Sequence, residues 1–235
     1  MNLIDRFQGV IFNPQQTFKA LAEKPFWKDA LILILIVWIV YGYVVYPFSQ
    51  RDNAQFMENN VRLKERMGEE RFNQALENLR NPSLSSKILR IFVLSPISLL
   101  VGFLFSSLIL LFFGRLTSTE GKYIHVFAAY VHANFIDKIL GNALRLVLVL
   151  LKKSYIQTTT SLALLFPQLE ITSPSYIILS QIDFFQLWMF GIFGYAISAI
   201  FKIPLKKALF ISYGFWLIKS ALYVAMGLLT MQFMR

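Results

Sequence analysis

Residues 182–229 read IDFFQLWMFGIFGYAISAIFKIPLKKALFISYGFWLIKSALYVAMGLL. Two apolar runs, 184–201 and 205–229, meet at a short basic connection. Each run is long enough for an α-helix to cross the hydrocarbon core of a bilayer, which is ~30 Å thick. Because the connection is so short, the two helices must be antiparallel neighbours. The stretch therefore predicts a transmembrane hairpin and an integral membrane protein.

The composition supports this class. Of the 235 residues, 56% are hydrophobic and 15% are charged, whereas roughly 25% of residues are charged in an average globular chain. The net charge of +10 fits a membrane protein, whose lysines and arginines gather in cytoplasmic loops near anionic lipid. The expected partner is thus the lipid bilayer and not nucleic acid. The absence of cysteine excludes a disulfide framework, a thiol nucleophile and a cysteine-ligated zinc site.

The apolar pattern predicts five membrane spans in all. Their bounds are about 30–46, 91–113, 123–151, 184–201 and 205–229. The predicted fold class is an all-α integral membrane protein, a five-helix transmembrane bundle with an amphipathic N-terminal segment and a charged helical loop between spans 1 and 2. Residues 1–28 form the interfacial segment and residues 29–235 the membrane domain.

The third span is unusual because it carries ionisable residues. They are His125, His132, Asp137, Lys138 and Arg145. The segment is either one tilted helix or two pieces that meet near 137–141. Two histidines seven residues apart lie roughly 10 Å apart along a straight helix, which is too far for both to hold one metal ion. No hydrolase motif accompanies them, so we expect no enzyme activity and no cofactor.

The N-terminal segment 1–28 is amphipathic and carries no signal-peptide pattern. Asn13 and Pro14 predict the start of a second short helix, which ends near Pro25. Two arrangements are open. The helices either lie flat at the headgroup level or pack against the cytoplasmic end of the bundle.

Segment 49–90 is the one long charged stretch, with eight basic and six acidic residues. Breaks are predicted at Gly68 and at Asn81-Pro82. An apolar stripe at helical spacing comprises Phe56, Leu63, Met67, Phe72, Leu76 and Leu79. The stripe is buried in a helical hairpin closed at Gly68, on the outer surface of the bundle, or in a groove of a partner protein.

Orientation follows from lysines and arginines in short loops. In a five-span protein, the basic N-terminal segment and the basic joints 115–122 and 202–207 share one side, and the nearly uncharged loop 154–181 lies on the other. The N-terminus is therefore expected in the cytoplasm. The charged segment 49–90 then lies outside.

Two sets of intramembrane contacts are predicted. Lys219 lies near the middle of the last span, where an ammonium group needs an anion. Asp137 and Asp183 are the candidates by depth, and Asp137 is preferred because it too lies mid-segment. Small residues four positions apart let helices approach closely. The fourth and fifth spans are thus expected to pack through Gly194, Ser198, Ala221 and Ala225.

The order of these features resembles the Yip family of Ypt/Rab-interacting membrane proteins. The resemblance rests on Asn13-Pro14 with Thr17-Phe18, on Gly121-Lys122 with Tyr130, and on Ile182-Asp183-Phe184 with Leu187-Trp188. The motif residues are Pro14, Phe18, Gly121, Asp183 and Trp188. The long cytosolic N-terminal region of eukaryotic members is absent, so a prokaryotic relative in the cytoplasmic membrane is the better match.

The resemblance implies a five-span bundle with a cytoplasmic N-terminus, no established catalytic residues, and a role in assembly or trafficking. Some bacterial relatives resemble accessory subunits of ABC-type exporters. The leading hypothesis is thus a non-enzymatic membrane interaction protein, with such an exporter or another envelope or trafficking complex as its expected partner. The alternative is a transporter or lipid-handling protein that uses its intramembrane ionisable residues.

Overall fold

The computed structural model describes residues 1–156 and 160–234, and this part of the chain consists of helices joined by loops, with no β-strand. The helices are α1 Leu3–Phe12, α2 Pro14–Glu23, α3 Lys28–Glu58, α4 Val61–Met67, α5 Glu69–Arg80, α6 Leu84–Ile88, α7 Ser95–Arg115, α8 Tyr123–Asn134, α9 Asn142–Lys152, α10 Pro174–Ser180, α11 Phe184–Phe201 and α12 Leu205–Met234. Two π-helical stretches, η1 Leu89–Leu94 and η2 Phe135–Gly141, and the 3-10 turn η3 Leu162–Leu165 complete the described ranges.

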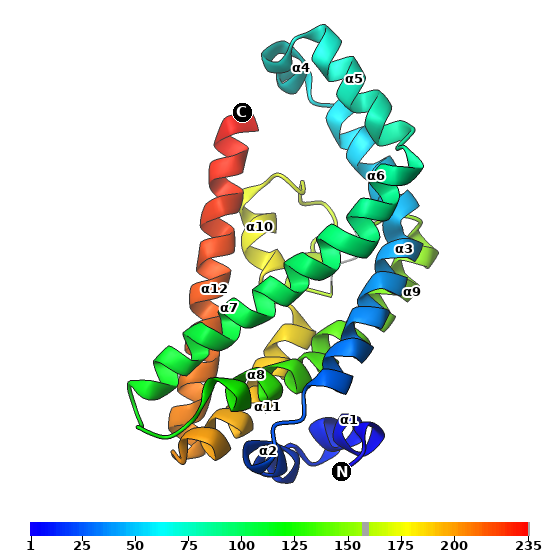
Figure 1. The fold of residues 1–235 in the computed structure, drawn as a ribbon. Coiled ribbons are helices and arrows are strands. Elements are labelled where there is room, and N and C mark those ends of the chain that lie inside the picture. The colour runs from blue at the N-terminus through cyan, green and yellow to red at the C-terminus, as the bar shows by residue number, and fades with distance from the viewer. Residues whose placement is uncertain (157–159, 235) are drawn as a thin grey trace.

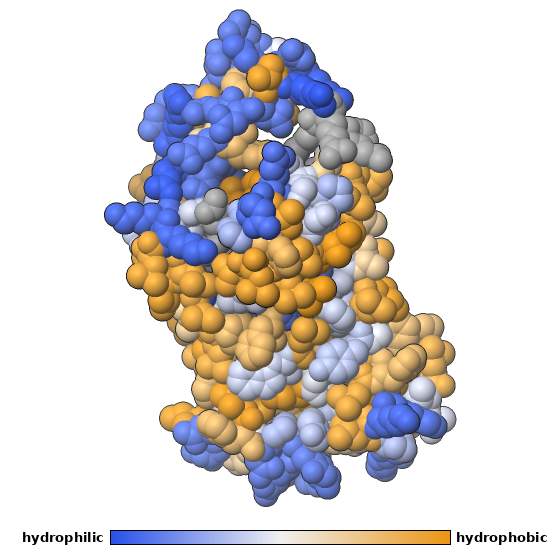
Figure 2. All heavy atoms as spheres, turned by 180° about the vertical axis from the view of Figure 1, so that it is seen from behind, coloured by the Kyte–Doolittle hydropathy of each residue, from blue (hydrophilic) through white to orange (hydrophobic). Residues whose placement is uncertain are grey.

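Four helical stretches of the described chain are long and apolar enough to cross a membrane. They are Lys28–Glu58, Leu84–Arg115, Phe184–Phe201 and Leu205–Met231. Figure 2 shows a broad hydrophobic band between two hydrophilic ends, which is the surface that a bilayer requires. The prediction of an all-α, multi-pass membrane protein is confirmed.

The third predicted span contains the longest unbroken run of buried residues in the described chain. It forms one continuous helical segment made of α8, η2 and α9, in which residues 126–137 are all buried. Helices α3, α7 and α11 pack against it, and α1 and α2 cover it from one end. Because neighbouring helices shield it from lipid, this segment carries polar residues that a lipid-facing helix would not tolerate.

The chain alternates between two ends of the bundle (Figure 1). At one end lie α1, α2 and the two short joints, which are tied together by an ion pair of 3.0 Å between Lys202 Nζ and Glu120 Oε1. At the other end lie α4, α5, α10 and the C-terminus. There Ser154 donates a hydrogen bond of 2.8 Å to Asp52, linking the loop after α9 to α3.

The N-terminal helices are part of the bundle core. Val10, Phe18 and Leu21 are at most 2% exposed, and the Phe7 ring lies 5.4 Å from the Phe135 ring. Some apolar residues on the outer side of these two helices are exposed, and Phe12 is 83% exposed. Both helices thus pack against the bundle, and their exposed apolar residues are suited to the membrane interface.

The first long helix extends beyond residue 46, where the predicted span 30–46 ends, and contains Pro47. Helix α3 continues through this proline to Glu58. A proline inside a helix removes one backbone hydrogen bond, a loss that neighbouring elements can offset. Here α5 returns alongside α3, and Arg80 pairs with Glu58. The predicted span 30–46 is therefore the first part of a longer helix.

Segment 49–90, which we call the arm, folds back on itself. Gly68 separates α4 from α5 with a φ of 79°, a conformation that favours glycine. Asn81 terminates α5, as predicted. Phe72 is 5% exposed, and the other five stripe residues are half-buried. The stripe is thus largely covered within the arm.

The hairpin of α11 and α12 is closest at Gly194. A Cβ at this position would lie 2.5 Å from Leu209 Cδ2 on α12. Further along, Ser212 donates a 2.6 Å hydrogen bond to the Phe190 carbonyl oxygen. Ser198 instead donates to the carbonyl of Ile203 in the joint.

The structure does not place the other two predicted packing residues in this interface. Ala221 and Ala225 are exposed. Helix α11 begins at Phe184, and its first turn already lies beside Lys219, because Gln186 contacts that residue. Beyond Lys219, α12 therefore has no part of α11 to pack on.

We predict that Gly194→Leu destabilises the fold, because a large side chain cannot fit against Leu209. Overpacking of this kind costs about 1–3 kcal/mol. Thermal unfolding in mild detergent, followed by tryptophan fluorescence, measures the loss. Gly214→Leu is the matched control, because nothing lies within 4 Å of a Cβ at Gly214. Equal loss in both variants would contradict the proposed close approach.

Candidate functional site

A cluster of charged side chains lies in the middle of the bundle and centres on Arg145 of α9. Its Nη2 donates a hydrogen bond of 2.8 Å to Asp137 Oδ1 and hydrogen bonds of 3.1 Å to both carboxylate oxygens of Asp183. Nη1 donates to Asn142 Oδ1 at 3.0 Å and to the Asp137 carbonyl at 3.2 Å, and Nε donates to Thr160 Oγ1 at 3.0 Å. A guanidinium group offers five N–H donors in a planar fork. Arg145 uses them to join three segments of the chain.

Asp183 is the second centre of this cluster. It is the N-cap of α11, where its Oδ1 accepts from the backbone N–H groups of Phe185 at 2.9 Å and Gln186 at 3.1 Å. Its Oδ2 accepts a 2.6 Å hydrogen bond from Thr160. The positive end of the helix and Arg145 both favour the charged carboxylate. Asp183 thus fixes where α11 begins.

The π-helical stretch η2 positions Asp137. π-Helical turns are rare and are often found at functional sites. Asp137 is 4% exposed, and its Oδ2 accepts from Lys138 Nζ at 2.7 Å. The Lys138 ammonium also lies 5.2 Å from the centre of the Trp38 ring. The carboxylate therefore has a cationic partner on each oxygen.

Lys219 of α12 lies beside this cluster with no carboxylate partner among the described residues. Its Nζ donates to Gln186 Oε1 at 3.3 Å and lies 5.4 Å from the centre of the Phe190 ring. Three cations and two carboxylates thus meet in the apolar band, which leaves one positive charge in excess.

Two adjoining cavities of about 310 Å³ each flank the cluster. They share Trp38, Asp137, Lys138 and Gln186. One extends between α7 and α12 and is lined by Ser98, Gly102, Ser106, Asn134 and Lys219, among others. The other extends toward Arg145, Tyr155 and Asp183. Polar side chains of the bundle thus line two open cavities beside the cluster.

The sequence predicted Lys219 as the partner of Asp137, and the structure gives this carboxylate a different partner. Both residues line one cavity, but Asp137 pairs with Arg145 and Lys138. Asp137 and Arg145 are eight residues apart, about 12 Å along an ideal α-helix. The intervening π-helical turn alters that register. The charge of Arg145 was noticed in the sequence, but its contact with Asp183 and Thr160 depends on tertiary structure.

A second polar link was not predicted. Asp52 near the end of α3 is 6% exposed, and its Oδ2 accepts hydrogen bonds from Ser154 Oγ and from the backbone N–H groups of Tyr155 at 2.6 Å and Ile156 at 3.2 Å. Its position in a charged segment gave no sign of burial. The link fixes the loop after α9 against α3.

The other motif residues have packing roles. Pro14 is the first residue of α2, and Phe18 is buried in the core. Gly121 has a φ of 89°, and a Cβ there would lie 2.7 Å from the Phe201 ring. Trp188 contacts the rings of Phe184 and Phe185. These residues shape the joints around the buried third segment.

We predict that Arg145→Gln strongly destabilises the protein, because it leaves two buried carboxylates without their main cation. Loss of one partner from a buried ion pair costs roughly 3–5 kcal/mol. Thermal unfolding in detergent measures this effect. Lys219→Gln is the control and should cost much less, since Lys219 has only a neutral hydrogen-bond partner.

Adding Asp183→Asn to Arg145→Gln should recover part of the lost stability, because Asp183 is left without a cation, whereas Asp137 keeps Lys138. An Arg145→Gln variant as stable as Lys219→Gln would show that the cluster does not hold the fold together.

A known protein family matches nearly the whole chain. The sequence model of the Yip1 domain matches residues 9–227. The match includes the buried third segment, the ion cluster and all five motif residues. No curated protein and no solved structure gives a significant match to the chain. The chain therefore belongs to the Yip1 domain family of membrane proteins.

Proposed function

We propose that this protein is a non-enzymatic membrane interaction protein that docks a partner complex through its arm. The prokaryotic cytoplasmic membrane is the proposed location. Family membership supports a membrane role without catalysis. An ABC-type exporter or another envelope complex is the partner class that the resemblance to bacterial relatives suggests.

Five crossings are proposed: α3, α7, the α8–η2–α9 segment, α11 and α12. The alternation of the joints between two ends of the bundle supports an odd number of crossings (Figure 1). The end with α1, α2 and the two short joints is proposed to face the cytoplasm. Its loops are short and rich in lysine and arginine, which is the pattern that cytoplasmic loops follow.

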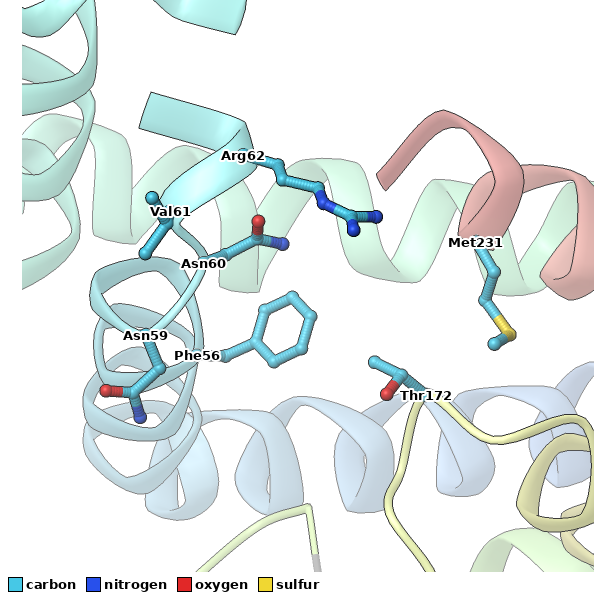
Figure 3. A pocket seen from close by; sticks show the side chains of 7 residues that line it. All are labelled: Phe56, Asn59, Asn60, Val61, Arg62, Thr172 and Met231. Atoms are coloured by element: carbon cyan, nitrogen blue, oxygen red, sulfur yellow. The ribbon is translucent and has the colours of Figure 1, made fainter. Parts of the chain in front are cut away.

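The observation that carries the docking proposal is a groove between the arm and the C-terminal part of α12. It has a volume of about 390 Å³ and is lined by Phe56, Asn59, Asn60, Val61, Arg62, Thr172 and Met231. In Figure 3 the Phe56, Arg62 and Met231 side chains extend toward the space between these segments. An aromatic ring and an arginine side by side are typical of residues that dominate protein interfaces.

The position and charge of the arm also support this role. Helices α4 and α5 project beyond the bundle (Figure 1). The pairs Lys64–Glu69 and Arg80–Glu58 balance some of the charge within the arm. A mixed surface of this kind keeps a helical hairpin soluble and does not concentrate one sign of charge for lipid headgroups or nucleic acid.

The ion cluster gives less support to the transport alternative. Asp137, Asp183 and Arg145 bind one another and saturate their hydrogen-bonding groups. Groups that carry a substrate or ion must exchange partners, whereas these groups hold α9, η2 and the start of α11 together. A structural clamp is therefore the better account of these three residues.

We predict that Arg62→Glu lowers recovery of the partner complex by at least tenfold when the tagged protein is purified from its native membrane in mild detergent. Loss of an interface hot spot costs ~2 kcal/mol or more, and 1.4 kcal/mol is a tenfold change. Quantitative mass spectrometry of the purified complex measures recovery. Arg71→Glu is the matched control, because Arg71 is exposed on the arm and does not line the groove.

The proposal fails if Arg62→Glu and Arg71→Glu give the same recovery, or if the wild-type protein is repeatedly purified alone. Phe72→Ser provides a further comparison. It should unfold the hairpin, since Phe72 is buried in it, and release the partner together with the arm structure.

A further inference from the structure

The excess cation Lys219 has no carboxylate partner among the described residues. Lys219 lies near the middle of the Leu205–Met231 stretch, where a charged group is costly unless it meets an opposite charge. Both neighbouring carboxylates are already occupied by Arg145 and Lys138. Only the neutral oxygen of Gln186 accepts from the ammonium group. The site therefore has room for an anion and a net charge that favours one.

Small residues of α7 line this cavity together with the larger Leu99 and Phe103. Ser98, Gly102 and Ser106 follow one another at intervals of four and all line the cavity. Nothing lies within 4 Å of a Cβ at Gly102, and Ser98 and Gly102 are exposed. Small residues at this spacing let a second helix approach the backbone closely. Since α7 and α12 are both apolar spans, this opening faces the lipid.

From these observations we propose that a transmembrane helix of the partner lies on the Ser98–Gly102–Ser106 face of α7 and directs an aspartate or glutamate to Lys219. The inference rests on the proposed function and names the chemistry of the partner. The proposed contact lies within the bilayer and is separate from the docking site at the arm.

Depth decides between a partner helix and a lipid headgroup as the source of the anion. Lipid phosphates lie at the two interfaces, whereas Lys219 is near the middle of its span. A transmembrane helix can hold a carboxylate at any depth, because its backbone hydrogen bonds are satisfied internally. The small residues on α7 also allow a helix backbone to approach closely, whereas an acyl chain does not require small residues.

The test uses the purified full-length protein in phosphatidylcholine vesicles with synthetic transmembrane helices made of leucine and alanine. One peptide has a single glutamate at its centre, and the matched peptide has glutamine there. Because the chain has no cysteine, Leu116→Cys accepts a fluorophore at an exposed site at the end of α7. Energy transfer to a labelled peptide then measures binding.

The glutamate peptide should bind about tenfold more tightly than the glutamine peptide, as expected for one strong polar contact between membrane helices. Lys219→Gln should abolish this preference, and Lys219→Glu should transfer it to a peptide with a central lysine. Two further variants test the site if Lys219→Gln or Lys219→Glu does not fold. Lys219→Arg should keep the preference for the glutamate peptide, and Gly102→Leu should weaken the binding of both peptides.

Equal binding of the two peptides by the wild-type protein would overturn the proposal. So would a preference for glutamate that survives Lys219→Gln. Displacement of the glutamate peptide by phosphatidylglycerol, but not by inorganic phosphate, in a Lys219-dependent manner would assign the site to a lipid and also overturn it. None of these outcomes affects the recovery experiment with Arg62→Glu, so the two proposals can fail independently.

Discussion

The contact of Arg145 with Asp137 and Asp183 is the interaction on which the rest of the structure depends. It ties η2 and α9 to the start of α11, and through Thr160 to the loop that joins them. In a bilayer there is no water to solvate these charges, so each must find its partner within the chain. The central segment can cross an apolar band because this arrangement satisfies its charges. Helices α3, α7 and α11 then cover it with apolar side chains.

The sequence predicts the apolar helices well because their signals are local. The start and end of α11 agree with the predicted 184–201, since an aspartate cap precedes a long apolar run and a basic joint follows it. Gly68 likewise marks the turn in the arm. The continuation of α3 through Pro47 and the exposure of Ala221 and Ala225 could not be predicted, because they depend on where α5 packs and where α11 begins.

Burial explains why the third segment resembles a membrane helix least, although it lies in the centre of the bundle. Residues 126–137 are all buried against other helices, so the composition there reflects helix contacts, and exposed apolar residues lie only toward the two ends of the segment, as at Leu144 and Leu151. The sequence shows which charges lie in this segment, but it cannot show that Arg145 takes Asp137 and leaves Lys219 with a neutral partner. The division into a paired structural cluster and one excess cation emerges only from the packed fold, and it separates the residues that maintain the structure from the one available for recognition.

The central claim is that the segment held by Arg145 crosses the membrane. Single cysteines introduced into this cysteine-free chain test it directly, at Thr119 before the segment and at Gln168 after it, both exposed. Labelling with a membrane-impermeant maleimide, applied to intact cells and to inverted vesicles, reports the side of each residue. The account predicts that the two cysteines are labelled from opposite sides of the membrane. Labelling of both from the same side would show that the segment enters and leaves the bilayer on one face, which would contradict the account.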